Sequence, residues 1–298
     1  MYDIIGRKKI YLGFSAILAI AAIAALGTFG LKEGIDFKGG TSWQARFATN
    51  PSTEAVRLAI EKDFNGEEAT VVSEPTTKSV IIRLPELDEK LHAEYKAALA
   101  KDFGTIEELS YETIGPAIGT ELKGRAAWAF LGVLLAISLY VAFAFRHVSR
   151  PVSSWKYALI TLVTLFHDAL IPLGMIAYLG HAYGVEMNTN IIVAILVVMG
   201  FSVHDTIVVF DRIRENLRLE RQGGGSFANL VNASVNQTMV RSVNTSLTLV
   251  LVLVALLAIG SANLFYFVLA ILVGVSLGTY SSIFVASPLL VLSNKAKS

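Results

Sequence analysis

The sequence contains no cysteine among its 298 residues, and only 16% of its residues are charged. The absence of cysteine excludes disulfide bonds, thiolate catalysis, iron–sulfur clusters and zinc sites built from cysteine. The scarcity of charge accompanies a hydrophobic share of 54% and a mean hydropathy of +0.58, well above the values typical of soluble domains. This composition predicts an integral membrane protein.

The few charges are unevenly distributed along the chain. Residues 31–125 hold 12 Lys and Arg against 17 Asp and Glu, which leaves 13 basic and 7 acidic residues elsewhere. Outside this acidic block, the basic residues lie in short clusters beside long apolar runs and do not form a stripe on a folded domain. This pattern argues against a nucleic-acid-binding protein.

Several apolar runs are long enough to cross a membrane, since a bilayer core about 30 Å thick requires roughly 20 helical residues. Residues 242–294 contain no Asp, Glu, Lys or Arg over 53 positions, so this run must hold two helices, turned near residues 260–263. The predicted transmembrane helices are residues 10–31, 126–145, 157–180, 187–210, 243–260 and 265–292. Arg7, Lys8 and Lys9 before the first run are also typical of a signal peptide, but the length of the run favours an uncleaved anchor.

The orientation follows from the Lys and Arg residues in the short loops. All 13 basic residues outside the acidic block fall on one side of the predicted helices, whereas the loops at 181–186 and 260–264 have none. The chain is thus predicted to have three parts: residues 1–31, with the first helix, residues 32–125, which lie outside, and residues 126–298, with the other five helices. Both termini are predicted to be cytoplasmic. Long translocated domains are exempt from this charge rule, so the basic residues of that block do not conflict with it.

Residues 32–125 are long enough for one small extracytoplasmic domain. Short β-branched runs at residues 41–47, 69–73, 79–84 and 106–114 alternate with two helical segments, residues 51–64 and 85–102. The order is βαββαβ, which predicts an α+β ferredoxin-like sandwich. Such a fold hosts many functions, and we see no catalytic constellation in it, so docking or contact with a substrate is the expected role.

Asp205 lies in the middle of the fourth predicted helix, where a charge costs roughly 2.5–3.5 kcal/mol and usually marks a pathway. Its expected partner is Arg241, at the base of a polar stripe on the fifth helix. Breaking such a pair by protonating the carboxylate would change the preferred packing, which is the minimal physics of proton-coupled motion. A protonated Asp205 that only bonds a neighbouring helix is the alternative. The stripe consists of Gln237, Arg241, Asn244, Thr245 and Thr248.

His167 and Asp168 form a second intramembrane pair, with Pro172 one turn further on. The pair either extends a relay of titratable groups or satisfies the backbone groups that the proline frees. His204, beside Asp205, points about 100° away on a helix and either shares its site or faces another neighbour. The small residues Gly274, Gly278 and Ser282 recur every four positions and predict close helix packing.

Two further segments are polar. Residues 211–221 continue the fourth helix as an Arg-rich interfacial helix, which could also dock a cytoplasmic partner. The triplet Gly223-Gly224-Gly225 lacks the Gly-Lys-Ser/Thr ending of a phosphate-binding loop and is interpreted as a turn. No nucleotide, metal or cofactor site is visible, so energy coupling must come from an ion gradient or a partner.

Several motifs resemble the SecD/SecF family of bacterial protein-export membrane proteins in the RND superfamily. They are GIDFKGG (34–40), IGPAIGTEL (114–122), His167-Asp168, GFSVHDTIVVFDRIRENLR (200–218) and QTMVRS (237–242), and the likeness spans nearly the whole chain. In this superfamily each half has six helices, with a large loop between the first two. Two departures from the family pattern are His204, where Asn is expected, and Lys38, where Thr is more usual.

The resemblance implies an accessory of the Sec translocon in the bacterial cytoplasmic membrane, driven by the proton-motive force, with protons as the coupling ion. It implies that Asp205 handles the proton, that Arg241 is its partner, and that Thr245 and Thr248 are polar neighbours. The implied partners are SecD in a heterocomplex, SecYEG with SecA, YajC and YidC, unfolded preproteins and membrane lipid.

Three other functions are weighed against this one. Half of a proton-coupled RND transporter for small molecules or lipids is disfavoured, because the outer domain lacks the larger loops of a substrate pocket. An intramembrane enzyme using His167 and Asp168 has neither an evident nucleophile nor metal-ligand spacing. A purely structural subunit is the third alternative. An enzyme should lose activity on His167→Ala, a proton-coupled machine on Asp205→Asn, and a scaffold on neither.

Overall fold

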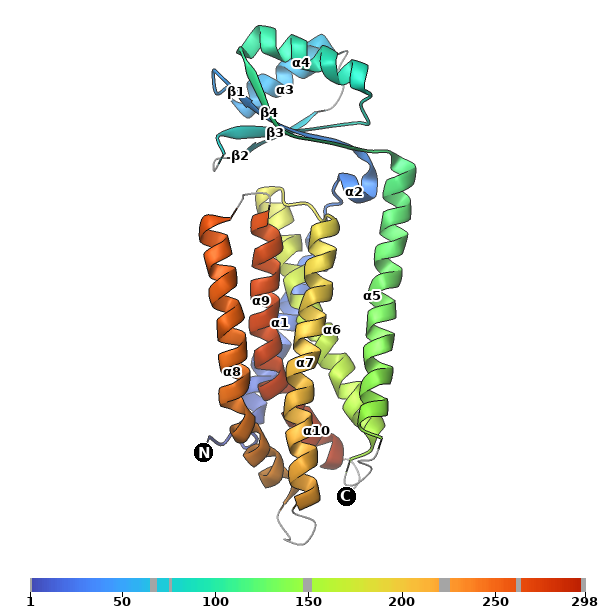
Figure 1. Cartoon of the computed structure of the whole chain (residues 1–298), viewed down its shortest axis with the longest axis vertical. Helices are drawn as coiled ribbons and strands as arrows, with labels where there is room; N and C mark the ends of the chain where they lie inside the picture. The colour runs from blue at the N-terminus through green and yellow to red at the C-terminus, as the bar shows by residue number, and fades with distance from the viewer. Residues whose placement is uncertain are drawn as a thin grey trace. The chain divides into compact units, whose positions relative to one another are not determined.

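The computed structural model describes residues 2–64, 69–74, 77–146, 152–219, 226–260 and 264–295 (Figure 1). Its contacts divide the chain into two compact units. The helical unit comprises Met1–Leu31, Trp128–Val185 and Asn190–Ser298, and the α+β unit comprises Lys32–Ala127 and Glu186–Thr189. The short loop Glu186–Thr189 thus folds with the α+β unit, which extends that unit beyond the predicted range of residues 32–125.

Among the described residues, 6 helices are long and apolar enough to cross a membrane, in agreement with the predicted fold class. They are α1 (Lys8–Phe29), α5 (Pro116–Ala144), α6 (Ser154–Tyr183), α7 (Thr189–Leu219), α8 (Phe227–Ile259) and the continuous span Phe265–Asn294, which begins with α9 (Phe265–Ser281). The last of these continues through a π-helix, Ser282–Ala286, into α10 (Ser287–Lys295).

Two helices begin well before their predicted starts. α5 begins at Pro116 and not at residue 126, and α8 begins at Phe227 and not at residue 243. Hydropathy identifies only the apolar part of a helix, whereas both helices have polar turns before it. The Arg-rich extension of α7 is helical to Leu219, while residues 220 and 221, the glycine triplet and the turn residues 261–263 lie outside the described residues.

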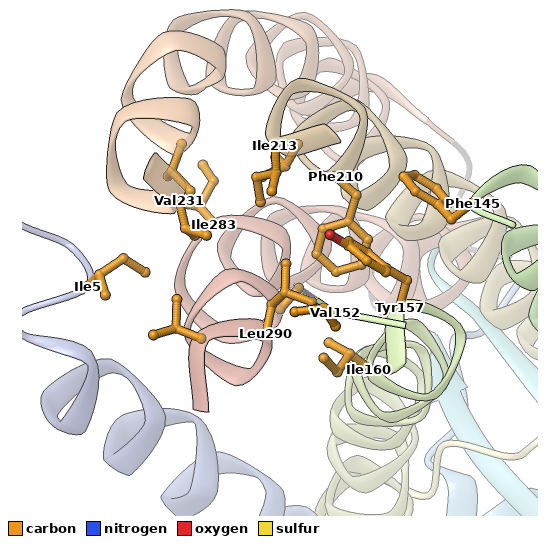
Figure 2. Packing of buried hydrophobic residues seen from close by; sticks show 14 of the residues in the cluster. Ile5, Phe145, Val152, Tyr157, Ile160, Phe210, Ile213, Val231, Ile283 and Leu290 are labelled. Atoms are coloured by element: carbon orange, nitrogen blue, oxygen red, sulfur yellow. The ribbon is translucent and has the colours of Figure 1, made fainter. Parts of the chain in front are cut away.

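The helical unit has a dense apolar core at the end of the unit where α6 begins and α7 ends (Figure 2). Its centre is aromatic: the ring of Tyr157 lies 5.1 Å, between centroids, from both Phe145 and Phe210. Figure 2 shows aliphatic side chains of the same cluster, with Val231 and Ile283 on the side away from these rings. By contrast, α1, α5 and α8 expose large apolar side chains, as helices facing lipid or a membrane partner do.

The segment before α1 is fastened to α8 by two asparagines one turn apart. The Asn232 side chain accepts hydrogen bonds from the backbone N–H groups of Ile4 and Ile5, at 2.9 and 3.1 Å. The Asn236 side chain accepts from the N–H of Tyr2 and donates to its carbonyl. Ile4 and Ile5 are buried in the aromatic-centred core, so the segment closes one side of that core.

The α+β unit contains a four-stranded antiparallel sheet of order β2-β3-β1-β4, the order of the predicted split βαβ sandwich. Its strands are β1 (Gly40–Phe47), β2 (Thr70–Glu74), β3 (Ser79–Leu84) and β4 (Ile106–Ile114), with helices α3 (Thr53–Asp63) and α4 (Glu89–Phe103). Figure 1 shows both helices on one face of the sheet, where Trp43, Ile82 and Tyr95 are fully buried.

Local signals explain where these helices begin and end. The Ser52 side chain accepts from the N–H of Ala55 and that of Asp88 from Leu91, so each caps the first turn of its helix. Gly104, with φ of 81°, ends α4 in a conformation that favours glycine. The domain therefore follows its sequence signals closely.

A short helix, α2 (Ile35–Lys38), was not predicted and leads into the paired glycines Gly39 and Gly40. Their φ values are 80° and 120°, and a Cβ on Gly39 would lie 2.7 Å from Cα of Pro116. A Cβ on Gly40 would lie 2.8 Å from the carbonyl oxygen of Leu84. Only glycine fits both positions, where the backbone must turn closely against α5 and β3.

Candidate functional site

Asp168 is the most enclosed acidic residue of the helical unit, with an exposed fraction of 0%. One carboxylate oxygen accepts hydrogen bonds from Ser202 on α7 and from Ser281 on α9, the latter at 2.5 Å. The other oxygen lies 2.8 Å from Nδ1 of His167. The side chain therefore joins three helices through polar contacts in an otherwise apolar interior.

His167 extends this cluster to a fourth helix. Its Nε2 lies 2.5 Å from Oγ of Ser15 on α1, so the imidazole bridges Ser15 and Asp168. This is the connectivity of a Ser-His-Asp triad, and it supplies the hydroxyl that sequence reasoning did not find. Ser15, however, is only 4% exposed and lies in a packed helix interface, whereas a nucleophile requires access to a substrate.

Asp205 on α7 is 4% exposed and accepts a hydrogen bond from Oγ of Ser282, at 2.5 Å. Ser202 and Asp205 are one turn apart on the same face of α7, so this face directs a hydroxyl to Asp168 and a carboxylate to Ser282. Thr206, beside Asp205, buries a hydroxyl without a hydrogen-bond partner among the described residues. One buried hydroxyl next to Asp205 is thus left unsatisfied by the part of the chain that the structure describes.

The predicted pair between Asp205 and Arg241 is not formed. Among the described residues Arg241 makes no ion pair, and it lies on the exposed face of α8. The physical reason is rotational: α8 turns Thr238, Ser242 and Ser246 inward, and the polar stripe follows a different face. The exposed stripe residues are Gln237, Arg241, Asn244, Thr245 and Thr248.

Other predicted site residues have the following places. Gln237 accepts hydrogen bonds from Arg212 and Asn216 of α7, and His204 is exposed, away from the buried face that holds Asp205.

A Cβ on Gly274 would lie 2.3 Å from the side chain of Val198, and one on Gly278 would lie 3.0 Å from Cβ of Ser202. These glycines thus allow α9 to approach α7, which brings Ser281 and Ser282 within reach of the carboxylates.

The contacts of the serines with the two carboxylates were not predicted from the sequence. Ser282, the first residue of the π-helix, was selected only as a packing residue by its four-residue spacing from Gly278. Ser281, the last residue of α9, and Ser202 were not selected, because serine is common in membrane helices. Among the described residues, no cluster of three or more His, Cys, Asp or Glu could hold a metal ion.

These features define a multi-pass membrane protein whose inner helices carry buried carboxylates and whose first two long helices are separated by an α+β unit. The family described as "Protein export membrane protein SecD/SecF, C-terminal" matches residues 94–296, and the "SecD/SecF GG Motif" matches residues 24–50. The chain belongs to the SecD/SecF family of bacterial protein-export membrane proteins.

Individual relatives agree with this assignment. The protein translocase subunit SecF of Thermobaculum terrenum is 42% identical over 98% of this chain and 93% of its own length. The subunit SecDF of Thermus thermophilus is 40% identical over 93% of this chain but only 37% of its own length. In SecDF the counterpart of this chain is therefore part of a longer polypeptide.

Solved structures show the same fold. The crystal structure of SecDF from Thermus thermophilus, described as a translocon-associated membrane protein, matches with a TM-score of 0.86 at 37% sequence identity. This match covers 99% of this chain and 39% of that chain. SecDF in its super-membrane-facing form matches with a TM-score of 0.70 over the same shares.

Proposed function

We propose that this chain is a proton-motive-force-driven accessory subunit of Sec protein export, which promotes preprotein translocation and release at the outer side of the membrane. Protons are the coupling ion, and Asp205 is the residue that binds them. The observation that supports this most directly is the environment of Asp205: a buried carboxylate, one serine donor, and no countercharge within hydrogen-bonding distance among the described residues.

A carboxylate in this setting has two states that differ in packing. When ionised, it requires a cation or several donors, since an unpaired buried charge is strongly unfavourable. When protonated, it is satisfied by neutral neighbours such as Ser282. A proton gradient can therefore favour one packing of α7 over another, and one charge crossing about 100 mV supplies roughly 2.3 kcal/mol.

A second membrane half is proposed to cover the exposed polar residues of α8 and to complete the environment of Asp205. Arg241 and Asn244 are polar residues on an exposed, largely apolar helix face, where lipid would leave their side chains unsatisfied. The hydroxyls of Thr245 and Thr248 on the same face donate to backbone carbonyls of α8. SecD is the natural partner, because in the Thermus thermophilus relative the matching region lies within a longer SecDF chain. Contact with SecD would cover this face and allow Arg241 to approach the proton site.

The remaining parts of the proposal concern orientation and wider partners. The clustering of basic residues supports cytoplasmic termini and an extracytoplasmic α+β unit, where an emerging preprotein could be contacted. SecYEG with SecA, and YajC and YidC, are the further partners we propose from the family. Lipid surrounds the complex, and no enzymatic step is assigned to this chain.

The test is preprotein translocation into inverted membrane vesicles under an imposed proton gradient. Asp205→Asn should abolish the gradient-dependent part and leave assembly with the partner unchanged. His204→Asn, a change at the adjacent exposed position, is the matched control and should retain most of that part. Unchanged translocation in Asp205→Asn at equal expression would mean that the carboxyl is structural and the proposal is wrong.

A further inference from the structure

The loop between α6 and α7 is built into the α+β unit, although its neighbours in sequence belong to the helical unit. Backbone groups hold it first. The N–H of Gly34 donates to the carbonyl of Met187 at 2.8 Å, and the N–H of Met187 donates to the carbonyl of Lys32 at 2.7 Å. Glu33 and Met187 thereby form an isolated parallel β-bridge. The loop is therefore attached through its backbone to the segment that leads into α2.

Side chains reinforce this attachment. Nε of Arg83, on β3, lies 3.0 Å from a carboxylate oxygen of Glu186, and both side chains are about four-fifths buried, with exposed fractions of 21% and 22%. The two opposite charges attract each other where little water screens them, although burial itself disfavours the charged form of the carboxyl. The pair connects β3 to Glu186, the residue before the β-bridge at Met187.

Asp36 then connects the unit to α7 itself. Its carboxylate accepts a hydrogen bond from the N–H of Thr189, the first residue of α7, at 2.6 Å. The first N–H groups of a helix have no partner within the helix, and a carboxylate there also interacts favourably with the helix dipole. Asp36 thus supplies from a distant part of the chain what a local N-cap residue normally supplies.

From these contacts we infer that Asp36 is the positioning residue that makes α7 move with the α+β unit, so that events at Asp205 are transmitted outward through a single helix. Asp205 and Thr189 lie on the same uninterrupted helix, Thr189–Leu219. A continuous helix carries an axial shift or rotation along its length, whereas a frayed first turn would absorb it. The inference rests on the proposed function, because it states how a change at the proposed proton site, Asp205, reaches the α+β unit.

The inference predicts uncoupling in a specific variant. Asp36→Ala removes the acceptor at the start of α7, while Asp36→Asn keeps an oxygen that can accept from Thr189. Losing an N-cap hydrogen bond gives roughly a fivefold change in equilibrium, so we expect about a fivefold loss of gradient-dependent translocation in Asp36→Ala. Asp36→Asn should recover most of it. Asp102→Ala, a change of an exposed acid on α4, is the matched control.

The readout must separate coupling from folding. The assembled complex in inverted vesicles should be assayed for gradient-driven proton uptake, gradient-dependent translocation and gradient-independent translocation. In Asp36→Ala only the second should fall, because protons still bind Asp205 while their effect is not transmitted. Wild-type translocation in this variant, or an equal fall of all three quantities, would overturn the inference.

A charge-swap cycle gives a second, independent measurement. Arg83→Glu and Glu186→Arg should each lower gradient-dependent translocation, and the double variant should restore it, since the ion pair is rebuilt in reverse. Failure of the double variant to recover would contradict the inference.

Asp205→Asn in the same vesicles separates a failure of the proposed function from a failure of the coupling inference. If Asp205→Asn has no effect, the proposed function fails. If it abolishes the gradient dependence while Asp36→Ala does not lower it, only the coupling fails.

Discussion

Ser281 and Ser282 are consecutive residues, yet their hydroxyls donate to two different carboxylates, those of Asp168 and Asp205. In a regular α-helix, adjacent side chains point about 100° apart, so one helix can serve two acid residues only if these lie on different sides of it. The transition from α9 into the π-helix occurs between the two serines. Single π turns inside helices are frequent at functional sites, and this one links the two buried acids.

Asp168 is predicted to stabilise the helical unit rather than to carry protons. Asp168→Ala removes the shared acceptor of His167, Ser202 and Ser281, at a cost of about 1–3 kcal/mol for each group left unsatisfied. Ser281 keeps the carbonyl of Gly278 as an acceptor, so the main loss falls on Ser202 and on Nδ1 of His167. The expected result is a large drop in thermal stability in detergent. Ser15→Ala, which removes only the outermost contact, should cost far less.

Further variants in the same cluster test the relay and enzyme alternatives. If Asp168→Asn remains folded and loses gradient-dependent translocation as completely as Asp205→Asn, then His167 and Asp168 belong to the proton path. If Ser15→Ala or His167→Ala removes a hydrolytic activity, then the triad-like connectivity is chemical. Neither result is expected, because the cluster is fully packed.

Arg241 is predicted to matter only in the complex. Its side chain is exposed and forms no ion pair among the described residues, so Arg241→Ala should change the stability of the isolated chain by less than about 0.5 kcal/mol. In assembled vesicles the same variant should lose gradient-dependent translocation. A marked destabilisation of the isolated chain would show instead that Arg241 has a partner within its own chain.

Glu186 gives the α+β unit a pH dependence of defined sign. Burial raises the pKa of its carboxyl, and the nearby charge of Arg83 opposes that shift. The folded state therefore holds this proton more tightly than the unfolded state, whose pKa is about 4.3. The stabilising contribution is fully present below that value and is lost as the pH rises through the raised folded pKa.

Glu186→Gln should remove this dependence, because the amide does not titrate. Thermal unfolding of the purified protein, measured from about pH 4 upward, should decline less with pH in the variant than in the wild type. Parallel profiles for the two proteins would contradict the assignment.

Two glycines in membrane helices should respond oppositely to the same substitution. A Cβ on Gly174 of α6 would lie 2.5 Å from Cα of Ala22 on α1, a backbone atom that cannot move aside easily. Gly174→Ala should therefore destabilise the helical unit by about 1–3 kcal/mol. Gly200→Ala on α7, where nothing lies within 4 Å, should be neutral or stabilising. Thermal unfolding in detergent compares them, and equal effects would refute the packing.

The α+β unit was predictable because its signals are local. Ser52, Asp88 and Gly104 mark helix boundaries through contacts with residues a few positions away, and alternating β-branched runs mark the strands. Asp168 and Asp205 could be selected as site residues for a different reason, which is that charge within an apolar run is rare enough to be informative.

Other features could not be predicted because they depend on distant contacts. Helical periodicity identifies a polar stripe around Arg241, but it does not say which neighbour that face meets, and the buried face of α8 is the one with Ser242 and Ser246. Similarly, nothing near Asp36 in the sequence indicates Thr189 as its partner. Likewise, the partners of Ser281 and Ser282 depend on how closely α9 approaches its neighbouring helices, which the sequence near these serines does not indicate.

The clamp formed by Asn232 and Asn236 has a consequence for natural variation. Both asparagines bind main-chain atoms of residues 2, 4 and 5, and none of these bonds depends on the side chain at residue 2, which is 74% exposed. Substitutions at position 2 should therefore leave these hydrogen bonds intact. Proline is the exception at all three positions, because it has no N–H to donate. The two asparagines therefore require backbone N–H groups at residues 2, 4 and 5 and place no demand on the side chain of residue 2.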